Sequence, residues 1–232
     1  MAVPRFVIMR HDVEQNLNAA EAMAVIDSEA GVKSTFFLLQ SGDYNCFSEC
    51  GARIVRRILS LGHDIGLHYD GGLLERLELD PATAVRSQIA MLESFFSTKV
   101  SAISAHMPAR SPVSVVVPHV VDVYSIPYCH AIKYVSDSLQ RWREGVVTSL
   151  LEKHDKIHLL THECNWSESG LGWDEIMLRD AQDRFDRHRS RTLETIERFR
   201  EGLASRAQRD AQFMDRLLSG SPQPARSNME PQ

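Results

Sequence analysis

The chain has 232 residues, of which 43% are hydrophobic and 25% are charged. This length and composition fit one globular domain with a sizeable core. The formal net charge of −5 gives no indication of a nucleic-acid or anionic-membrane partner. No apolar run approaches the roughly 18 residues that a membrane span requires, and no signal peptide precedes the first predicted strand, so we expect a cytoplasmic protein.

Strands and helices alternate along most of the chain. Buried strands, seen as short apolar runs rich in β-branched or aromatic residues, are predicted at 6–9, 32–39, 62–70, 100–104, 134–138 and 157–162. Amphipathic helices are predicted at 16–30, 52–61, 80–96 and 173–218. This order favours an α/β fold with its site at the C-terminal strand ends. About six to eight strands in roughly 170 residues leave little room for a full eightfold barrel, so we expect a distorted or incomplete (β/α) barrel.

Helix boundaries are marked by local signals. Asn16 and Asp80 are predicted N-caps, and Pro81 follows Asp80 at the first helical position. Gly31 and Gly62 are placed to end the first two helices.

The last helical stretch, 173–218, is strongly charged and carries the apolar residues Leu193, Ile196 and Phe199 on one stripe. Two interpretations stay open: a surface helix packed on the core, or a helix that pairs with a second subunit as a homo-oligomer. We assign 1–218 to a single catalytic domain. Residues 219–232 contain almost nothing to bury and are predicted to be a disordered tail.

Polar side chains follow several of the predicted strands where each strand ends. Asp12 comes directly after the first apolar run, and later runs lead into His68, His106 and His162. The C-terminal ends of parallel strands meet at one edge of a sheet or barrel. We therefore expect these side chains to converge on one site.

The residue types at these strand ends suit a metal ion. Asp12, His68 and His106 are the predicted ligands, since one carboxylate and two imidazoles suit a borderline divalent ion such as Zn²⁺. Such an ion lowers the pKa of bound water to about 7 and polarises a carbonyl. Asp70 lies two residues after His68, on the same side of an extended backbone, and is the alternative to His106.

Proton transfer is assigned to three further residues. His11 is the predicted base if the backbone turns after the strand, with a packing role as the alternative. His162 lies on a different strand end and is the predicted general acid for a leaving amine. Asp137 is placed to orient His162, or to cap a turn.

Four residues are candidates for substrate binding. Arg10 would bind an acidic group or neutralise carboxylate charge, and Asp70 is a polar contact near His68. Trp142 and Trp166 would form an apolar wall against a sugar ring, although tryptophan is more often found in a core.

Three segments together resemble the polysaccharide deacetylase family (NodB-homology, carbohydrate esterase 4-like). Arg10-His11-Asp12-Val13-Glu14 is similar to the family's Thr-Phe-Asp-Asp motif, and Ser34-Thr35-Phe36-Phe37 to its Ala-Thr-Phe-Phe strand. Gly62-His63-Asp64-Ile65-Gly66-Leu67-His68 is similar to its Gly-His-Glu-Ile-Gly-x-His motif. The resemblance implies a distorted (β/α) barrel and metal-dependent hydrolysis of an N- or O-acetyl group on a sugar. It also implies Asp12 and His68 as metal ligands and His162 as general acid.

The chain departs from the family pattern at two positions. The family's general-base aspartate is His11 here, and its second metal histidine, four residues after the first, is Gly72. His11 is the expected replacement base, and His106 or Asp70 the replacement ligand. The Arg-His-Asp version is similar to a divergent branch among bacterial surface-polysaccharide enzymes.

The sequence thus predicts a metal-dependent sugar N-deacetylase acting on an amino-sugar in bacterial surface polysaccharide (lipopolysaccharide or O-antigen) biosynthesis. A metal-free amide hydrolase of the same fold and a non-catalytic glycan-binding module remain the alternatives.

Overall fold

The computed structural model describes residues 5–111, 114–167 and 170–219. The chain divides into two compact units, Met1–Asp180 and Ala181–Gln232. The assignment of residues 1–218 to a single catalytic domain stays a prediction. The predicted tail lies outside the described residues, apart from Ser219, which ends a helix.

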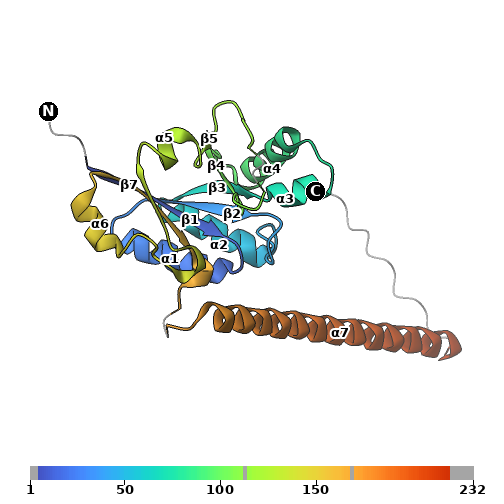
Figure 1. Cartoon of the computed structure of the whole chain (residues 1–232). Coiled ribbons are helices and arrows are strands. Elements are labelled where there is room, and N and C mark those ends of the chain that lie inside the picture. Colours follow the sequence, from blue (N-terminus) through green and yellow to red (C-terminus); the bar gives the residue numbers. More distant parts are fainter. Residues whose placement is uncertain (1–4, 112–113, 168–169, 220–232) are drawn as a thin grey trace. The chain divides into compact units, whose positions relative to one another are not determined.

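The first unit is built on one sheet of seven strands that all pair in parallel (Figure 1). The strands are β1 (Phe6–Val13), β2 (Ser34–Leu39), β3 (Asp64–Tyr69), β4 (Ala102–Ala105), β5 (Val121–Asp122), β6 (Lys133–Ser136) and β7 (Lys156–His162). Their order across the sheet is β5-β4-β3-β2-β1-β7-β6. The sheet curls without joining β5 to β6, so the predicted incomplete barrel is confirmed.

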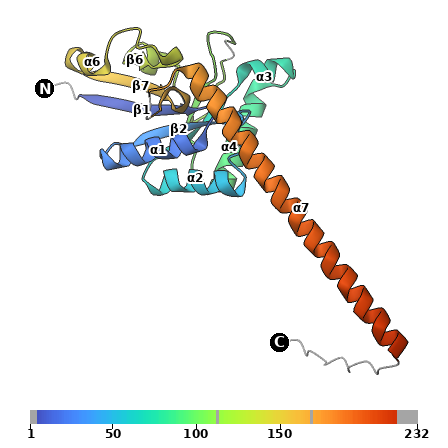
Figure 2. The ribbon, with the colours of Figure 1, turned by 90° about the horizontal axis from the view of Figure 1, so that it is seen from below.

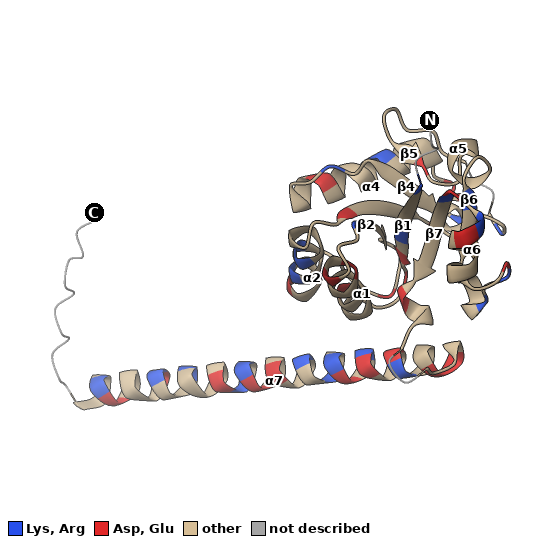
Figure 3. Cartoon of the chain, turned by 90° about the vertical axis from the view of Figure 1, so that its left-hand side faces the viewer, with Lys and Arg blue, Asp and Glu red and all other residues tan. Residues whose placement is uncertain are grey.

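Helices lie in the connections between the parallel strands, except between β4 and β5, where the described residues include no helix, and the last helix follows β7. They are α1 (Leu17–Glu29), α2 (Glu49–Ser60), α3 (Gly71–Arg76), α4 (Pro81–Phe96), α5 (Ile126–Cys129), α6 (Val147–Lys153) and α7 (Trp173–Ser219), with short 3₁₀ turns η1 (Ser138–Gln140) and η2 (Glu163–Asn165). Helices α1 and α2 pack side by side along the sheet (Figures 2 and 3).

The predicted helix starts are confirmed at two positions. The side chain of Asn16 accepts hydrogen bonds from the backbone N–H groups of Asn18 and Ala19, and Asp80 accepts one from Thr83 with Pro81 in the first turn. Helix α2 begins at Glu49, three residues before the predicted start, because Ser48 supplies its N-cap.

The core lies between the sheet and its helices. Phe36, Leu38, Leu67 and Ile103 have no exposed surface, and they come from three neighbouring strands. Central parallel strands covered on both faces read as continuous apolar runs, which is why β2 and β3 were recognisable in the sequence.

Ile176 near the start of helix α7 is buried, but Phe185, Phe199 and Phe213 further along it are all more than half exposed. These three recur every 14 residues, and Ile196 and Leu203 are seven apart. Spacing in multiples of seven is typical of a helix that pairs with another helix. Basic and acidic residues alternate along its length (Figure 3). In the part of the chain that the structure describes, no helix combines the length and apolarity needed to cross a membrane.

Candidate metal centre and catalytic residues

The parallel sheet brings distant segments to one edge. In the register of the sheet, Asp12 on β1 lies opposite His162 on β7, and His68 on β3 lies opposite Ser104 on β4. All four strands end in the same direction. The expected convergence of strand-end side chains is therefore observed.

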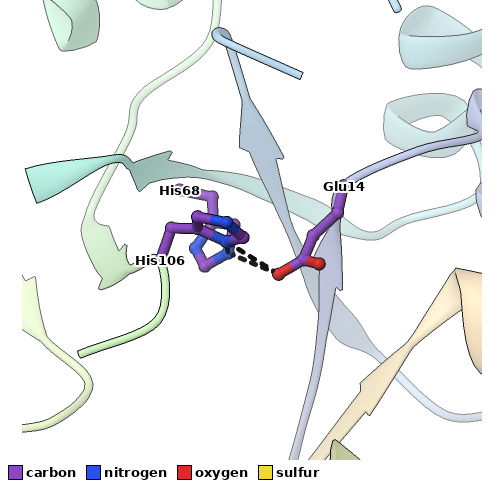
Figure 4. Close-up of side chains that lie close together, drawn as sticks. All are labelled: Glu14, His68 and His106. Atoms are coloured by element: carbon purple, nitrogen blue, oxygen red, sulfur yellow. Dashed lines mark hydrogen bonds and ion pairs between the residues drawn. The ribbon is translucent and has the colours of Figure 1, made fainter. Parts of the chain in front are cut away.

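A carboxylate and two imidazoles meet at this edge. One oxygen of Glu14, Oε1, lies 2.9 Å from Nδ1 of His106 and 3.2 Å from Nε2 of His68 (Figure 4). The two imidazole nitrogens are themselves 3.2 Å apart. The group Glu14, His68 and His106 could hold a metal ion, with ligand atoms that all lie within 4.8 Å of one another.

The spacing of these atoms fits a tetrahedral ion. Zinc bonds of about 2.0–2.1 Å in a tetrahedron place the ligand atoms roughly 3.4 Å apart. The observed separations of 2.9–3.2 Å need only a few tenths of an ångström of expansion. Two imidazoles and one carboxylate also leave positions open for water and substrate.

The hydrogen bonding of His68 favours a cation at the centre. Its Nδ1 lies 3.0 Å from the carbonyl oxygen of Ser104 and therefore donates a hydrogen bond to it. In the neutral ring, Nε2 then carries a lone pair, which faces Oε1 of Glu14. Two acceptors that face each other require a proton or a metal ion between them. A backbone carbonyl that fixes the tautomer of a ligating histidine is a common feature of metal sites.

The carboxylate of the cluster is Glu14, whereas Asp12 was the predicted carboxylate ligand. The two residues are two apart, so both side chains project from the same side of the chain. Asp12 lies deeper, where it accepts a hydrogen bond of 3.0 Å from the hydroxyl of Ser104. Burial opposes its ionisation, but Arg10 and the imidazoles of His68 and His162 hold the pKa of Asp12 below its ordinary value.

His11 lies on the opposite side of β1, which contradicts its expected role as base. Its ring has no exposed surface. Nε2 lies 2.8 Å from a carboxylate oxygen of Asp27, Nδ1 lies 2.7 Å from the hydroxyl of Thr161, and the ring packs against Phe36. Successive residues of a strand point to opposite faces, and β1 extends through Val13 without the turn that would have redirected His11.

Arg10 is fully buried and cannot contact a substrate, which corrects its predicted role. Its guanidinium donates to the hydroxyl of Ser104 at 2.8 Å, lies 3.7 Å from Asp12 and faces the ring of Tyr124. Arg10 therefore balances the buried charge of Asp12. This was the second of the two roles that the sequence left open.

His162 and Asp137 form a pair at the end of β7. Nδ1 of His162 donates to Asp137 at 2.7 Å, and the indole N–H of Trp166 donates to the same carboxylate at 2.9 Å. Burial disfavours the charged ring, but the hydrogen bond to Asp137 and the charge of Asp12 outweigh it and raise the pKa of His162 to about 9. The predicted contact between Asp137 and His162 is therefore present, and the role of His162 as general acid stays a prediction.

The other predicted substrate contacts lie outside the central cavity. A cavity of about 190 Å³ is lined by Asp12, Glu14, His68 and His162, together with nonpolar and neutral residues that include Trp173. Trp142 and Trp166 pack edge to face beside it and are not among its lining residues. Asp70 caps helix α3 and lines a separate cavity behind His106.

Sequence reasoning missed the role of Glu163. This side chain is buried, and its Oε1 accepts hydrogen bonds from the backbone N–H groups of Glu14, Gln15 and Asn16 at 3.0, 2.5 and 2.9 Å. Its second oxygen is buried without a hydrogen-bond partner among the described residues. Burial raises the pKa of Glu163 to about 7 against the opposing effect of these donors. Glu163 thus fixes the turn that presents Glu14. Its place directly after His162, at the exit of the last strand, was the available signal.

No family model and no curated protein matches the chain. Among solved structures, the matches include the carbohydrate esterase 4 (CE4) domain of a multidomain xylanase from the hindgut metagenome of Trinervitermes trinervoides, at 13% identity and a TM-score of 0.46 over 78% of this chain and 85% of that one. The chitin deacetylase of Colletotrichum lindemuthianum matches at 14% identity and a TM-score of 0.43, with the same coverage of 78% and 85%.

A CE4-family pseudoenzyme from Bacillus anthracis matches at 16% identity and a TM-score of 0.43, over 78% of this chain and 62% of that protein. The chain thus spans less than two thirds of the length of this pseudoenzyme. The matched proteins belong to the family that the sequence motifs resemble.

Proposed function

We propose that the protein is a metal-dependent amide hydrolase that removes the acyl group from an amino-sugar in bacterial surface polysaccharide (lipopolysaccharide or O-antigen) biosynthesis. The observation that carries the proposal is the cluster of Glu14, His68 and His106, because Glu14 and His68 of this cluster line the same cavity as His162 and Asp12. An ion ligand set, a proton acceptor and a proton donor close to one another are what hydrolysis of an unactivated amide requires.

Glu14, His68 and His106 would hold the ion, with Zn²⁺ as the first candidate from the donor set. When bound, a divalent ion supplies Lewis-acid chemistry, because it polarises an amide carbonyl and lowers the pKa of water. Burial opposes the charge of Glu14, but the neighbouring imidazoles of His106 and His68 keep its pKa well below the ordinary value, so it is an anionic ligand at neutral pH.

Asp12 is the residue that we assign as general base, in place of His11. It lines the cavity, and Arg10 keeps it ionised in a buried position. Its carboxylate is therefore available to take a proton from the attacking water. His162, protonated and held by Asp137, gives a proton to the leaving nitrogen.

The test is metal content measured together with activity. Protein purified without chelator is analysed for bound divalent ions, and acetate release from an N-acetylated amino-sugar is followed before and after chelation. We expect about one ion per chain, loss of activity on chelation, and loss of both in His68→Ala. Protein that holds no divalent ion, even after soaking with Zn²⁺, would count against the proposal.

The same measurements separate the alternatives. Acetate release that survives chelation would favour a metal-free amide hydrolase of this fold. Saturable sugar binding without hydrolysis, unchanged in His162→Ala, would favour a non-catalytic glycan-binding module. CE4-family pseudoenzymes among the matched structures make this control necessary.

A further inference from the structure

A second cavity adjoins the cavity of the metal cluster. Its volume is about 520 Å³, against about 190 Å³ for the first. The residues that line both cavities are Met107, Pro108, Tyr124, Ser138 and Leu139. A substrate whose acyl group lies at the cluster therefore has room to extend past these residues into the second cavity.

The two cavities differ in charge. The first contains the carboxylates of Asp12 and Glu14, whereas the second is lined by the guanidinium groups of Arg110 and Arg143. Among the described residues, Glu144 is the one acidic residue that lines the second cavity, and Lys133 forms an ion pair with it.

Arg110, Arg143 and Glu144 give the lining of the second cavity a formal charge of +1, and the ion pair with Lys133 offsets the one anion, in a chain whose net charge is −5. The charge is therefore concentrated locally and does not follow from the composition of the chain.

The two arginines are available to a ligand. Within the described residues, neither Arg110 nor Arg143 forms an ion pair with an acidic side chain. The guanidinium of Arg110 makes a weak contact with the sulfur of Met107, at 3.9 Å. Arg110 also lines the cavity that contains Asp70 and Glu75, and it pairs with neither. Guanidinium groups bind carboxylate and phosphate oxygens through two parallel hydrogen bonds.

We propose that this second cavity, which we call the arginine subsite (Arg110, Arg143 and the wall formed by Tyr134), binds an anionic group attached to the acylated sugar. The substrate is then an acidic sugar, carrying a phosphate or a carboxylate, and not a neutral polymer. This inference rests on the proposed function for the position of the acyl group, while the charge of the subsite stands independently of it.

The experiment compares the affinity of the full-length protein for three probes by calorimetry: N-acetylglucosamine, N-acetylglucosamine 1-phosphate and N-acetylmuramic acid. We expect the phosphate probe to bind at least tenfold tighter than the neutral sugar. The double variant Arg110→Gln/Arg143→Gln loses this advantage and keeps its affinity for the neutral sugar. The matched control Arg200→Gln/Arg209→Gln, two exposed positions on α7, removes the same charge and retains the advantage.

Equal affinity for neutral and charged probes overturns the arginine subsite, as does an advantage that persists in the Arg110→Gln/Arg143→Gln variant. A stronger preference for N-acetylmuramic acid supports the subsite and assigns it to a carboxylate, and a preference for the phosphate assigns it to a phosphate. Acetate release from each probe is followed alongside binding, so the outcomes separate. A protein that binds the sugar phosphate without deacetylating it contradicts the proposed function and supports the subsite.

Discussion

Replacing Glu163 tests whether one buried carboxylate holds the turn that presents Glu14. In Glu163→Ala the backbone N–H groups of residues 14, 15 and 16 lose their shared acceptor. A buried donor left without a partner costs about 1–3 kcal/mol, so three partly buried donors cost about 3 kcal/mol even at the lower limit. For a domain of this size, about 3 kcal/mol lowers Tm by roughly 6–12 °C.

The turn that Glu163 holds carries the metal ligand Glu14, so we expect the affinity for Zn²⁺ to fall as well in Glu163→Ala. Loss of a residue that orients a metal ligand typically weakens metal binding by about 10- to 100-fold. Urea unfolding of the metal-free protein gives the change in stability, and competition with a chromogenic chelator gives the change in Zn²⁺ affinity.

Two further variants separate positioning from general destabilisation. Glu163→Gln keeps an oxygen that can accept from the three N–H groups, and its uncharged amide resembles the protonated acid that a pKa of about 7 makes accessible, so it should restore most of both properties. Leu92→Ala truncates a fully buried side chain of α4 at a comparable cost of about 2–5 kcal/mol and should leave Zn²⁺ affinity unchanged. The reasoning is refuted if Glu163→Ala binds Zn²⁺ as the native protein does, or if Leu92→Ala weakens binding equally.

Three further predictions address the ligands, the proton donor and the long helix. Glu14→Gln should bind Zn²⁺ at least tenfold more weakly, since an anionic ligand is lost; unchanged affinity in the competition assay would remove Glu14 from the ligand set. Acetate release should decline as pH rises through about 9, where His162 loses its proton. Because that pKa is raised on folding, its contribution to stability is also complete below about pH 6.5 and lost by about pH 9. Asp137→Asn should move both the decline in activity and the loss of stability to lower pH. A pH profile that does not move would exclude the pair as the proton donor. We expect α7 to pair with a second copy of the chain, so Ile196→Glu/Phe199→Glu should reduce the mass measured by light scattering from dimer to monomer; a native monomer would contradict the pairing.

The sequence alone determined the strands other than the two-residue β5, and the edge at which the site lies. Buried parallel strands are continuous apolar runs, so β2 and β3 were visible without any tertiary information. The side chain that follows each run must lie near the C-terminal edge, which placed His68, His106 and His162 correctly. The N-cap at Asn16 was equally local, because a cap involves only neighbouring residues.

Only the tertiary structure decided which polar side chain does what. His11, Asp12 and Glu14 stand within four residues of one another, yet one pairs with Asp27 on α1, one lies beneath the site and one faces the two imidazoles. Side chains on and just after the first strand find their partners on β3, β4 and β7, so their contacts depend on residues that lie 54, 92 and 150 positions away in the chain. The sequence determines which groups are available at the edge of the sheet, and the register of the sheet determines the distances between these groups.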